Sequence, residues 1–202
     1  MIRVVKLGGS LHTAPELADW LSAVANAGGR VVLVPGGGPF ADQVRVAQAR
    51  WRFSDSMAHR MALLAMEQYG LMLCGLASGL EPAASRDEIA VLLARGATPV
   101  WQPTKLCLND PDIPENWDVT SDSLALWLAG VLDADAVALI KHAAPGADKD
   151  IAQLAEAGQV DRAFPAYLAR RPLPVRIFGR NDMIAFEKWL DDPACQPGND
   201  NP

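Results

Sequence analysis

The sequence predicts an α/β protein, a three-layer sandwich with a mainly parallel open sheet and helices on both faces. Short runs of buried, β-branched residues alternate with longer amphipathic runs along the whole chain. The first two expected strands end directly in glycines, as strands do where they turn into helices. Neither a repeat nor a linker interrupts this order. We therefore expect a single domain over residues 1–191 and a disordered tail over residues 192–202, where Pro, Gly, Asn and Asp dominate.

Composition excludes several classes of protein. The chain has 202 residues, of which 50% are hydrophobic, enough for one substantial core. A net charge of -6 argues against nucleic acid as the main partner. No apolar run reaches the roughly 18 residues of a membrane span. The three cysteines are scattered and the three histidines lie far apart, so we expect reduced thiols, a cytoplasmic location and no structural metal site.

In the first half, Leu17, Leu21 and Val24 give one helix an apolar face, and Gly28 ends it. On a later helix Met57, with Leu64 and Leu71 on the same side, is expected to fill the core. The expected elements are a strand at 2–6, a helix at 14–27, a strand at 30–34, a helix at 40–50, a long helix from the capping sequence at 54–56 to residue 76, and a helix at 86–95.

In the second half, residues 102–117 are rich in proline and polar residues, and so long an irregular stretch in a compact domain is often functional. Thr120 or Ser121 caps the helix that follows, on which Leu124, Trp127 and Leu128 form an apolar face. The expected elements are strands at 98–101, 136–140 and 174–178, and helices after residue 120, at 150–157, at 160–170 and at 183–190.

Two glycine-rich loops suggest anion binding. The strand at 30–34 continues into Pro35 and then Gly36, Gly37 and Gly38 before a helix begins, and the first strand ends in Gly8, Gly9 and Ser10. Backbone N–H groups in such turns, together with a helix N-terminus, suit a phosphate or carboxylate. A tight turn without a ligand is the alternative. Neither loop has the spacing of the common nucleotide-binding motifs.

Charged residues also stand where strands end. Lys6 ends the first strand and Lys141 the strand at 136–140, while Gly179 follows the last strand and precedes Arg180. In a parallel sheet these residues meet the glycine loops along one edge, where open α/β sheets bind ligands.

Three further polar residues remain ambiguous. Asp122 lies in the first turn of a helix, where a carboxylate is favoured in any case. His59 either faces the substrate or is a capped surface histidine. Lys105, in the irregular stretch, is either a ligand-binding or a solvated lysine.

Three stretches in this order resemble the signatures of the amino acid kinase superfamily: VKLGGS at residues 5–10, VPGGG at 34–38 and TSDSLA at 120–125. The short length and the form WDVTSDSL at residues 117–124 are similar to the small aminomethylfuranyl-methyl phosphate kinases of methanofuran biosynthesis. The resemblance implies an ATP- and Mg²⁺-dependent kinase with a small phosphorylated substrate, and a homo-oligomer.

The resemblance also implies roles for residues. Lys6 contacts the transferring phosphoryl group and Asp122 organises the charges around it. It implies that Gly8, Gly9 and Ser10 hold the ATP phosphates and that Gly36, Gly37 and Gly38 hold the anionic end of the acceptor. Beyond the resemblance, the further candidates for phosphate or nucleotide binding are Lys141, Gly146, Gly179 and Arg180. The further candidates for acceptor binding are His59, Lys105, Thr120 and Ser121.

The second half departs from the family pattern. Family members usually carry Thr-Asp and a Gly-Val or Gly-Ile turn after the fourth strand, whereas this chain has IKHAAPG at residues 140–146. Two alternatives therefore stay open: a kinase of a carboxylate acceptor that yields an acyl phosphate, and a non-catalytic binding or regulatory subunit.

Overall fold

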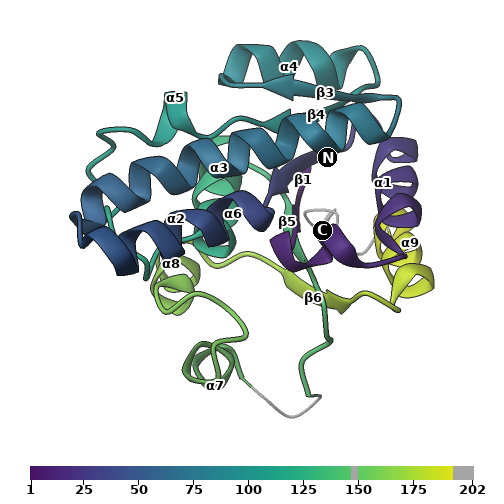
Figure 1. The fold of residues 1–202 in the computed structure, drawn as a ribbon. Coiled ribbons are helices and arrows are strands. Elements are labelled where there is room, and N and C mark those ends of the chain that lie inside the picture. Colours follow the sequence, from purple (N-terminus) through teal and green to yellow (C-terminus); the bar gives the residue numbers. More distant parts are fainter. Residues whose placement is uncertain (147–149, 193–202) are drawn as a thin grey trace.

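A computed structural model describes residues 1–146 and 150–192 of the chain (Figure 1). Its centre is a sheet of six parallel strands in the order β3-β4-β2-β1-β5-β6. The strands are β1 (Arg3–Leu7), β2 (Val31–Pro35), β3 (Leu80–Ala83), β4 (Thr98–Trp101), β5 (Ala136–Lys141) and β6 (Val175–Gly179). The expected three-layer α/β architecture is confirmed.

Helices connect successive strands, as parallel pairing requires. They are the 3₁₀ helix η1 (Gly9–Thr13), α1 (Leu17–Asn26), α2 (Gly38–Trp51), α3 (Asp55–Leu76), α4 (Arg86–Ala94), α5 (Thr104–Cys107), α6 (Ser121–Val131), α7 (Ile151–Glu156), α8 (Phe164–Arg170) and α9 (Met183–Asp191).

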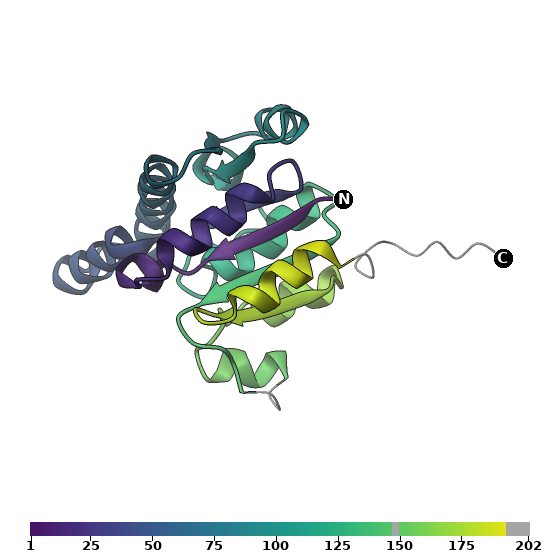
Figure 2. The same cartoon turned by 90° about the vertical axis from the view of Figure 1, so that its right-hand side faces the viewer.

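Hydrophobic side chains fill both faces of the sheet. Val4 and Val32 belong to a cluster that includes residues of α6 and α8, whereas Val5 and Leu33 belong to a cluster with α1 and α9. Successive residues of a strand point to opposite faces, which explains why β1 is buried along its whole length. Figure 2 shows α1 in purple and α9 in yellow side by side over one face of the sheet.

The two glycine-rich loops pack backbone against backbone. A Cβ on Gly36 would lie 2.4 Å from the N atom of Gly9, and a Cβ on Gly9 would lie 2.4 Å from the N atom of Gly38. Gly36 donates its N–H to Leu7 O at 2.9 Å, and Gly8 donates to Ile140 O at 2.8 Å. These two N–H groups therefore extend the sheet and are not available to an anion, whereas the sequence predicted that N–H groups of these loops suit one. The glycines are needed because the loops touch each other.

Several elements differ from expectation. Strand β3 was not expected: it is a short edge strand, a position where Pro82 is tolerated. The glycine turn after β1 continues as η1, and the stretch at 102–117 contains α5. Helix α8 begins at Phe164 rather than at residue 160.

The side of α3 that is buried is not the side that the sequence predicted. Met57 is 51% exposed, Leu64 48% and Leu71 53%, so the stripe they form at seven-residue spacing faces outward. The helix instead buries another side, which includes Leu63, Met66, Tyr69 and Leu73. The amphipathic pattern of α3 is weak because both sides are apolar, and the wrong side was assigned to the core.

Helices α3, α4, α6 and α9 contact strands of the sheet, whereas α2 packs on α3 and α7 packs on α8. The single-domain boundary at residue 191 stays a prediction. The expected tail lies outside the described residues from residue 193 onward. Within residues 1–146 and 150–192, none of the helices combines the length and the apolar character that crossing a membrane requires.

Candidate active site

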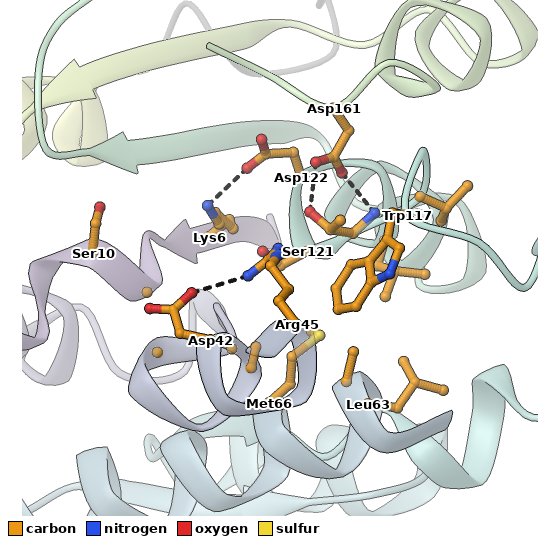
Figure 3. A pocket seen from close by; sticks show the side chains of 18 of the residues that line it. Lys6, Ser10, Asp42, Arg45, Leu63, Met66, Trp117, Ser121, Asp122 and Asp161 are labelled. Atoms are coloured by element: carbon orange, nitrogen blue, oxygen red, sulfur yellow. Dashed lines mark hydrogen bonds and ion pairs between the residues drawn. The ribbon is translucent and has the colours of Figure 1, made fainter. Parts of the chain in front are cut away.

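A cavity of about 320 Å³ opens at the carboxyl ends of the central strands (Figure 3). The chain places β2, β3 and β4 on one side of β1 and then returns to place β5 and β6 on the other. Such a reversal in an open α/β sheet creates a crevice for ligands. Lys6 of β1, Lys141 of β5 and the first turn of α6 all line the cavity.

The floor of the cavity carries a charged trio. Asp122 Oδ1 lies 2.8 Å from Lys6 Nζ, and Asp122 Oδ2 pairs with Lys141 Nζ. All three side chains are largely buried. One carboxylate thus holds two ammonium groups, and the trio keeps a net positive charge. The buried carboxylate of Asp161, in the same cavity, acts on Lys141 and offsets part of this positive charge.

The pKa values follow from this arrangement. Burial acts to raise the pKa of Asp122, but the ammonium groups of Lys6 and Lys141 outweigh it and hold that pKa below its ordinary value. Burial, and then the charge of Lys6, lower the pKa of Lys141 to about 8. Asp122 is therefore ionised at neutral pH, while Lys141 begins to lose its proton just above it.

The first turn of α6 is capped from a distant segment. Thr120 precedes the helix but its side chain makes no capping hydrogen bond. Asp161 replaces it: its Oδ2 accepts hydrogen bonds from the N–H groups of Thr120 and Ser123, both at 2.9 Å, and its Oδ1 accepts from Thr120 Oγ1. Burial, and then the charge of Asp122, raise the pKa of Asp161.

One wall of the cavity is aromatic and apolar. Trp117 Nε1 donates to Gln48 Oε1 at 2.6 Å, and the guanidinium of Arg45 lies over the Trp117 ring, 4.5 Å from its centroid. Arg45 also pairs with Asp42 at 3.1 Å. Leu63 and Met66 complete this side of the cavity (Figure 3). The wall suits a small, flat organic group.

His59 is buried and is not a surface histidine. It is 5% exposed and lines the cavity, and its Nε2 has no hydrogen-bond partner within the described part of the chain. Burial lowers its pKa, and a hydrogen bond to the backbone of Asn116 opposes this shift in part. A neutral ring held in this way leaves Nε2 as a buried hydrogen-bond acceptor.

The structure brings most of the predicted site residues together. Those that line the cavity are Lys6, Gly9, Ser10, Gly37, Gly38, His59, Thr120, Ser121, Asp122 and Lys141. Gly8 and Gly36 lie behind them and shape the loops: a Cβ on Gly8 would lie 2.9 Å from Ile140 O. Whether these residues bind ligands stays a prediction.

Four predicted residues lie outside the cavity. Lys105 is on α5 with its ammonium 3.5 Å from Glu88 and its side chain 60% exposed. Gly179 and Arg180 end β6: Gly179 donates its N–H to Asp182 at 2.8 Å, and the carbonyl of Arg180 accepts a hydrogen bond from Trp20. Gly146 lies in the connection after β5.

Sequence reasoning did not single out Asp161, Arg45 or Asp42. Asp161 caps a helix that begins about forty residues earlier, which no local pattern reveals. Arg45 and Asp42 look like ordinary surface charges of α2, and a spacing of three residues is their only signal.

The carboxylates of the site do not form a cage for Mg²⁺. Both oxygens of Asp122 face lysines, and both oxygens of Asp161 accept hydrogen bonds from the α6 terminus. Within residues 1–146 and 150–192 no three His, Cys, Asp or Glu side chains gather as a metal site. Mg²⁺ commonly binds through substrate phosphates and waters, so these residues would fit the metal only together with a phosphate ligand.

Comparison with known proteins identifies related sequences and folds. The sequence model of the amino acid kinase family matches residues 1–144. The chain is 30% identical over 142 residues to the [5-(aminomethyl)furan-3-yl]methyl phosphate kinase of Methanocaldococcus jannaschii. The aligned region covers 65% of this chain and 62% of that protein. It is 26% identical over 195 residues to the acetylglutamate kinase of Anaeromyxobacter dehalogenans, covering 73% and 72%. The chain therefore spans less than two thirds of the first of these relatives.

Solved structures share the fold. The uridylate kinase from Archaeoglobus fulgidus superposes with a TM-score of 0.67 at 16% identity, over 95% of this chain and 96% of that chain. The UMP kinase from Ureaplasma parvum gives a TM-score of 0.64 at 14% identity, over 89% of each chain.

Proposed function

We propose that this chain, which belongs to the amino acid kinase family, is an ATP-dependent kinase that transfers a phosphoryl group to a small phosphate monoester. The observation that carries this proposal is the buried trio of Lys6, Asp122 and Lys141 at the floor of a cavity between two glycine loops. Phosphoryl transfer depends mainly on positioning and on charge neutralisation, which two fixed ammonium groups supply.

Each member of the trio has a role in this mechanism. Lys6 donates hydrogen bonds to the transferring phosphoryl group, and Lys141 supplies a second positive charge beside it. Asp122 keeps both ammonium groups in place and offsets part of their mutual repulsion. No strong base is required, because a phosphate acceptor is already ionised near pH 7. The lysines therefore act on the charge that shifts among the phosphoryl oxygens.

The loop residues are proposed to align the two substrates. Gly9 and Ser10 lie beside Lys6 and suit the phosphates of the nucleotide, while Gly37 and Gly38, at the start of α2, suit the anionic end of the acceptor. Mg²⁺ bound to the nucleotide would lower the negative charge of its phosphates.

The acceptor is proposed to be a phosphate monoester with a small furan ring, such as [5-(aminomethyl)furan-3-yl]methyl phosphate, which would place the enzyme in methanofuran biosynthesis. The relative from Methanocaldococcus jannaschii acts on this compound by name. Trp117, Leu63 and Met66 suit a flat ring, and the unpartnered Nε2 of His59 suits the ammonium group of such an acceptor.

A specific observation favours each alternative. The likeness to an acetylglutamate kinase supports a carboxylate acceptor and an acyl phosphate product. The match to the family model stops at residue 144, where the nucleotide segment departs from the family pattern, and this supports a non-catalytic subunit.

One experiment separates the three proposals. The protein is incubated with ATP, Mg²⁺ and the furanyl phosphate or a carboxylate, and products are followed by ³¹P NMR with and without hydroxylamine. A diphosphate that survives hydroxylamine supports the leading proposal, and a product trapped by hydroxylamine supports the acyl phosphate. Without any transfer or ATP binding, the subunit proposal holds and the kinase proposal fails.

We also propose a homo-oligomer that covers the exposed stripe of α3. Met57, Leu64 and Leu71 repeat every seven residues, the spacing of helices that pack together. With a two-fold axis near Leu64, an antiparallel pair of α3 helices would place apolar residues against each other. Light scattering of the wild type and of Leu64→Glu tests this: a smaller particle for the variant supports the interface, and equal masses contradict it.

The cytoplasmic location stays a prediction from the cysteine pattern.

A further inference from the structure

We propose that Asp161 is a positioning residue of the phosphotransfer site: it fixes the first turn of α6 and, through it, the carboxylate of Asp122 between the two lysines. This inference rests on the proposed function. It concerns a residue beyond the segment that the family model matches, which ends at residue 144.

The hold of Asp161 on α6 is extensive. Its two oxygens accept three hydrogen bonds from Thr120 and Ser123, two of them from backbone N–H groups at 2.9 Å. Two residues further on, in the turn before α8, the N–H of Ala163 donates to the carbonyl of Asp118 at 3.0 Å. The segment at 161–163 therefore lies as a brace across residues 118–123.

The brace acts on the reactive centre through a short path. Ser121 and Asp122 lie between the two residues that Asp161 holds, so their backbone cannot shift independently of it. The carboxylate of Asp122 contacts Lys6 of β1 and Lys141 of β5, which are fixed in the sheet. A displacement of the α6 terminus would thus move this carboxylate relative to both ammonium groups.

The carboxylate of Asp161 also affects the protonation of Lys141. Lys141 is surrounded by Asp122, Lys6 and Asp161, and the carboxylate of Asp161 helps the lysine to keep its proton. A side chain that keeps the hydrogen bonds but lacks the charge should therefore move the titration of Lys141 to lower pH. A purely structural cap would not produce that shift.

Three variants test the proposal. Asp161→Ala removes the hydrogen bonds and the charge, while Asp161→Asn keeps an acceptor for the backbone and removes the charge. Ser85→Ala is the control, because Ser85 caps α4 with a bond to the N–H of Glu88, away from the cavity. We expect kcat to fall about 10- to 100-fold in Asp161→Ala, the usual effect of a small misplacement. Asp161→Asn should keep a larger kcat than Asp161→Ala, and the decline of its kcat at high pH should begin at a lower pH than in the wild type. Ser85→Ala should leave kcat unchanged.

A second measurement does not depend on turnover. Amide hydrogen exchange should show faster exchange at Thr120 and Ser123 in Asp161→Ala, and NMR titration of the Lys141 side chain should show a lower pKa in Asp161→Asn. An inactive wild type with both changes would contradict the proposed function yet support the brace. Unchanged amide protection, an unchanged Lys141 titration, or a kcat of Asp161→Ala within threefold of wild type would overturn the inference.

Discussion

Lys6 Nζ and Asp122 Oδ1 lie 2.8 Å apart at the bottom of the cavity, with both side chains almost fully buried. A buried ion pair does not by itself stabilise a fold, because removing two charges from water costs about as much as their attraction returns. Here the second oxygen of Asp122 also holds Lys141, which leaves the trio positively charged. We therefore propose that the trio serves anion binding more than stability.

Asp122→Asn should lower both turnover and stability. The neutral amide leaves two buried ammonium groups without a counter-charge, so the free energy of unfolding should fall by about 3 kcal/mol, the usual cost of breaking a buried pair. We expect kcat to fall at least about 100-fold. Asp133→Asn, which removes a surface partner of Arg171, should change neither quantity in denaturant titration or steady-state kinetics. Normal turnover in Asp122→Asn would remove Asp122 from the catalytic residues.

The pKa of Lys141 predicts opposite pH trends for activity and stability. Because burial lowers this pKa from 10.5 to about 8, kcat should decline as the pH rises through 8 and the second cation is lost. Between about 8 and 10.5 the unfolded chain binds more protons at this position than the folded one, so the contribution of Lys141 to the free energy of unfolding should rise. Lys141→Arg keeps its charge and should lack the basic limb near pH 8. The same limb in Lys141→Arg would assign it to another group.

Gly36→Ala tests the contact between the loops. The new Cβ would lie 2.4 Å from the N atom of Gly9, so the loops must separate and the free energy of unfolding should fall by about 1–3 kcal/mol. Gly75 of α3 has no heavy atom within 4 Å of the corresponding position, and Gly75→Ala should raise stability by about 0.5–1 kcal/mol. Thermal denaturation of both variants gives the comparison, and equal effects would contradict the packing described.

ATP with Mg²⁺ should raise the melting temperature. A ligand at 100 times its Kd adds about 2.7 kcal/mol to the stability of the state that binds it. Lys141→Met should shrink this shift, since the ammonium group no longer meets the phosphates. A full shift in Lys141→Met would place the nucleotide away from the trio, and the absence of any shift in the wild type would favour the non-catalytic subunit.

Local patterns were sufficient for most of the fold. The β-branched runs predicted β1, β2 and β5, and the glycines predicted both loops of the cavity. Strand β3 escaped because an edge strand of four residues, two of them exposed, has little hydrophobic pattern. The stripe on α3 was assigned to the core because an apolar side looks the same in sequence whether it is buried or exposed.

The site residues at the ends of strands could be predicted from the sequence. Those that are brought together from distant parts of the sequence could not. Lys6 and Lys141 could be placed at one edge because parallel strands share a direction. Asp161 could not, because its hydrogen bonds to Thr120 and Ser123 join segments that local periodicity does not connect. The burial of His59 followed from the orientation of α3, which the sequence left open.

The most direct measurement is the steady-state kinetics of Lys6→Met beside the wild type, with ATP, Mg²⁺ and the acceptor identified by ³¹P NMR. Lys6 should bind the transferring phosphoryl group more tightly in the transition state than in the ground state. We predict a fall of kcat by about 10²–10³ with a much smaller change in the KM of the acceptor. Methionine keeps much of the bulk of the lysine stem, and a denaturation curve will show that the variant is folded. A kcat within about threefold of wild type would contradict the role of Lys6 and the mechanism built on the trio.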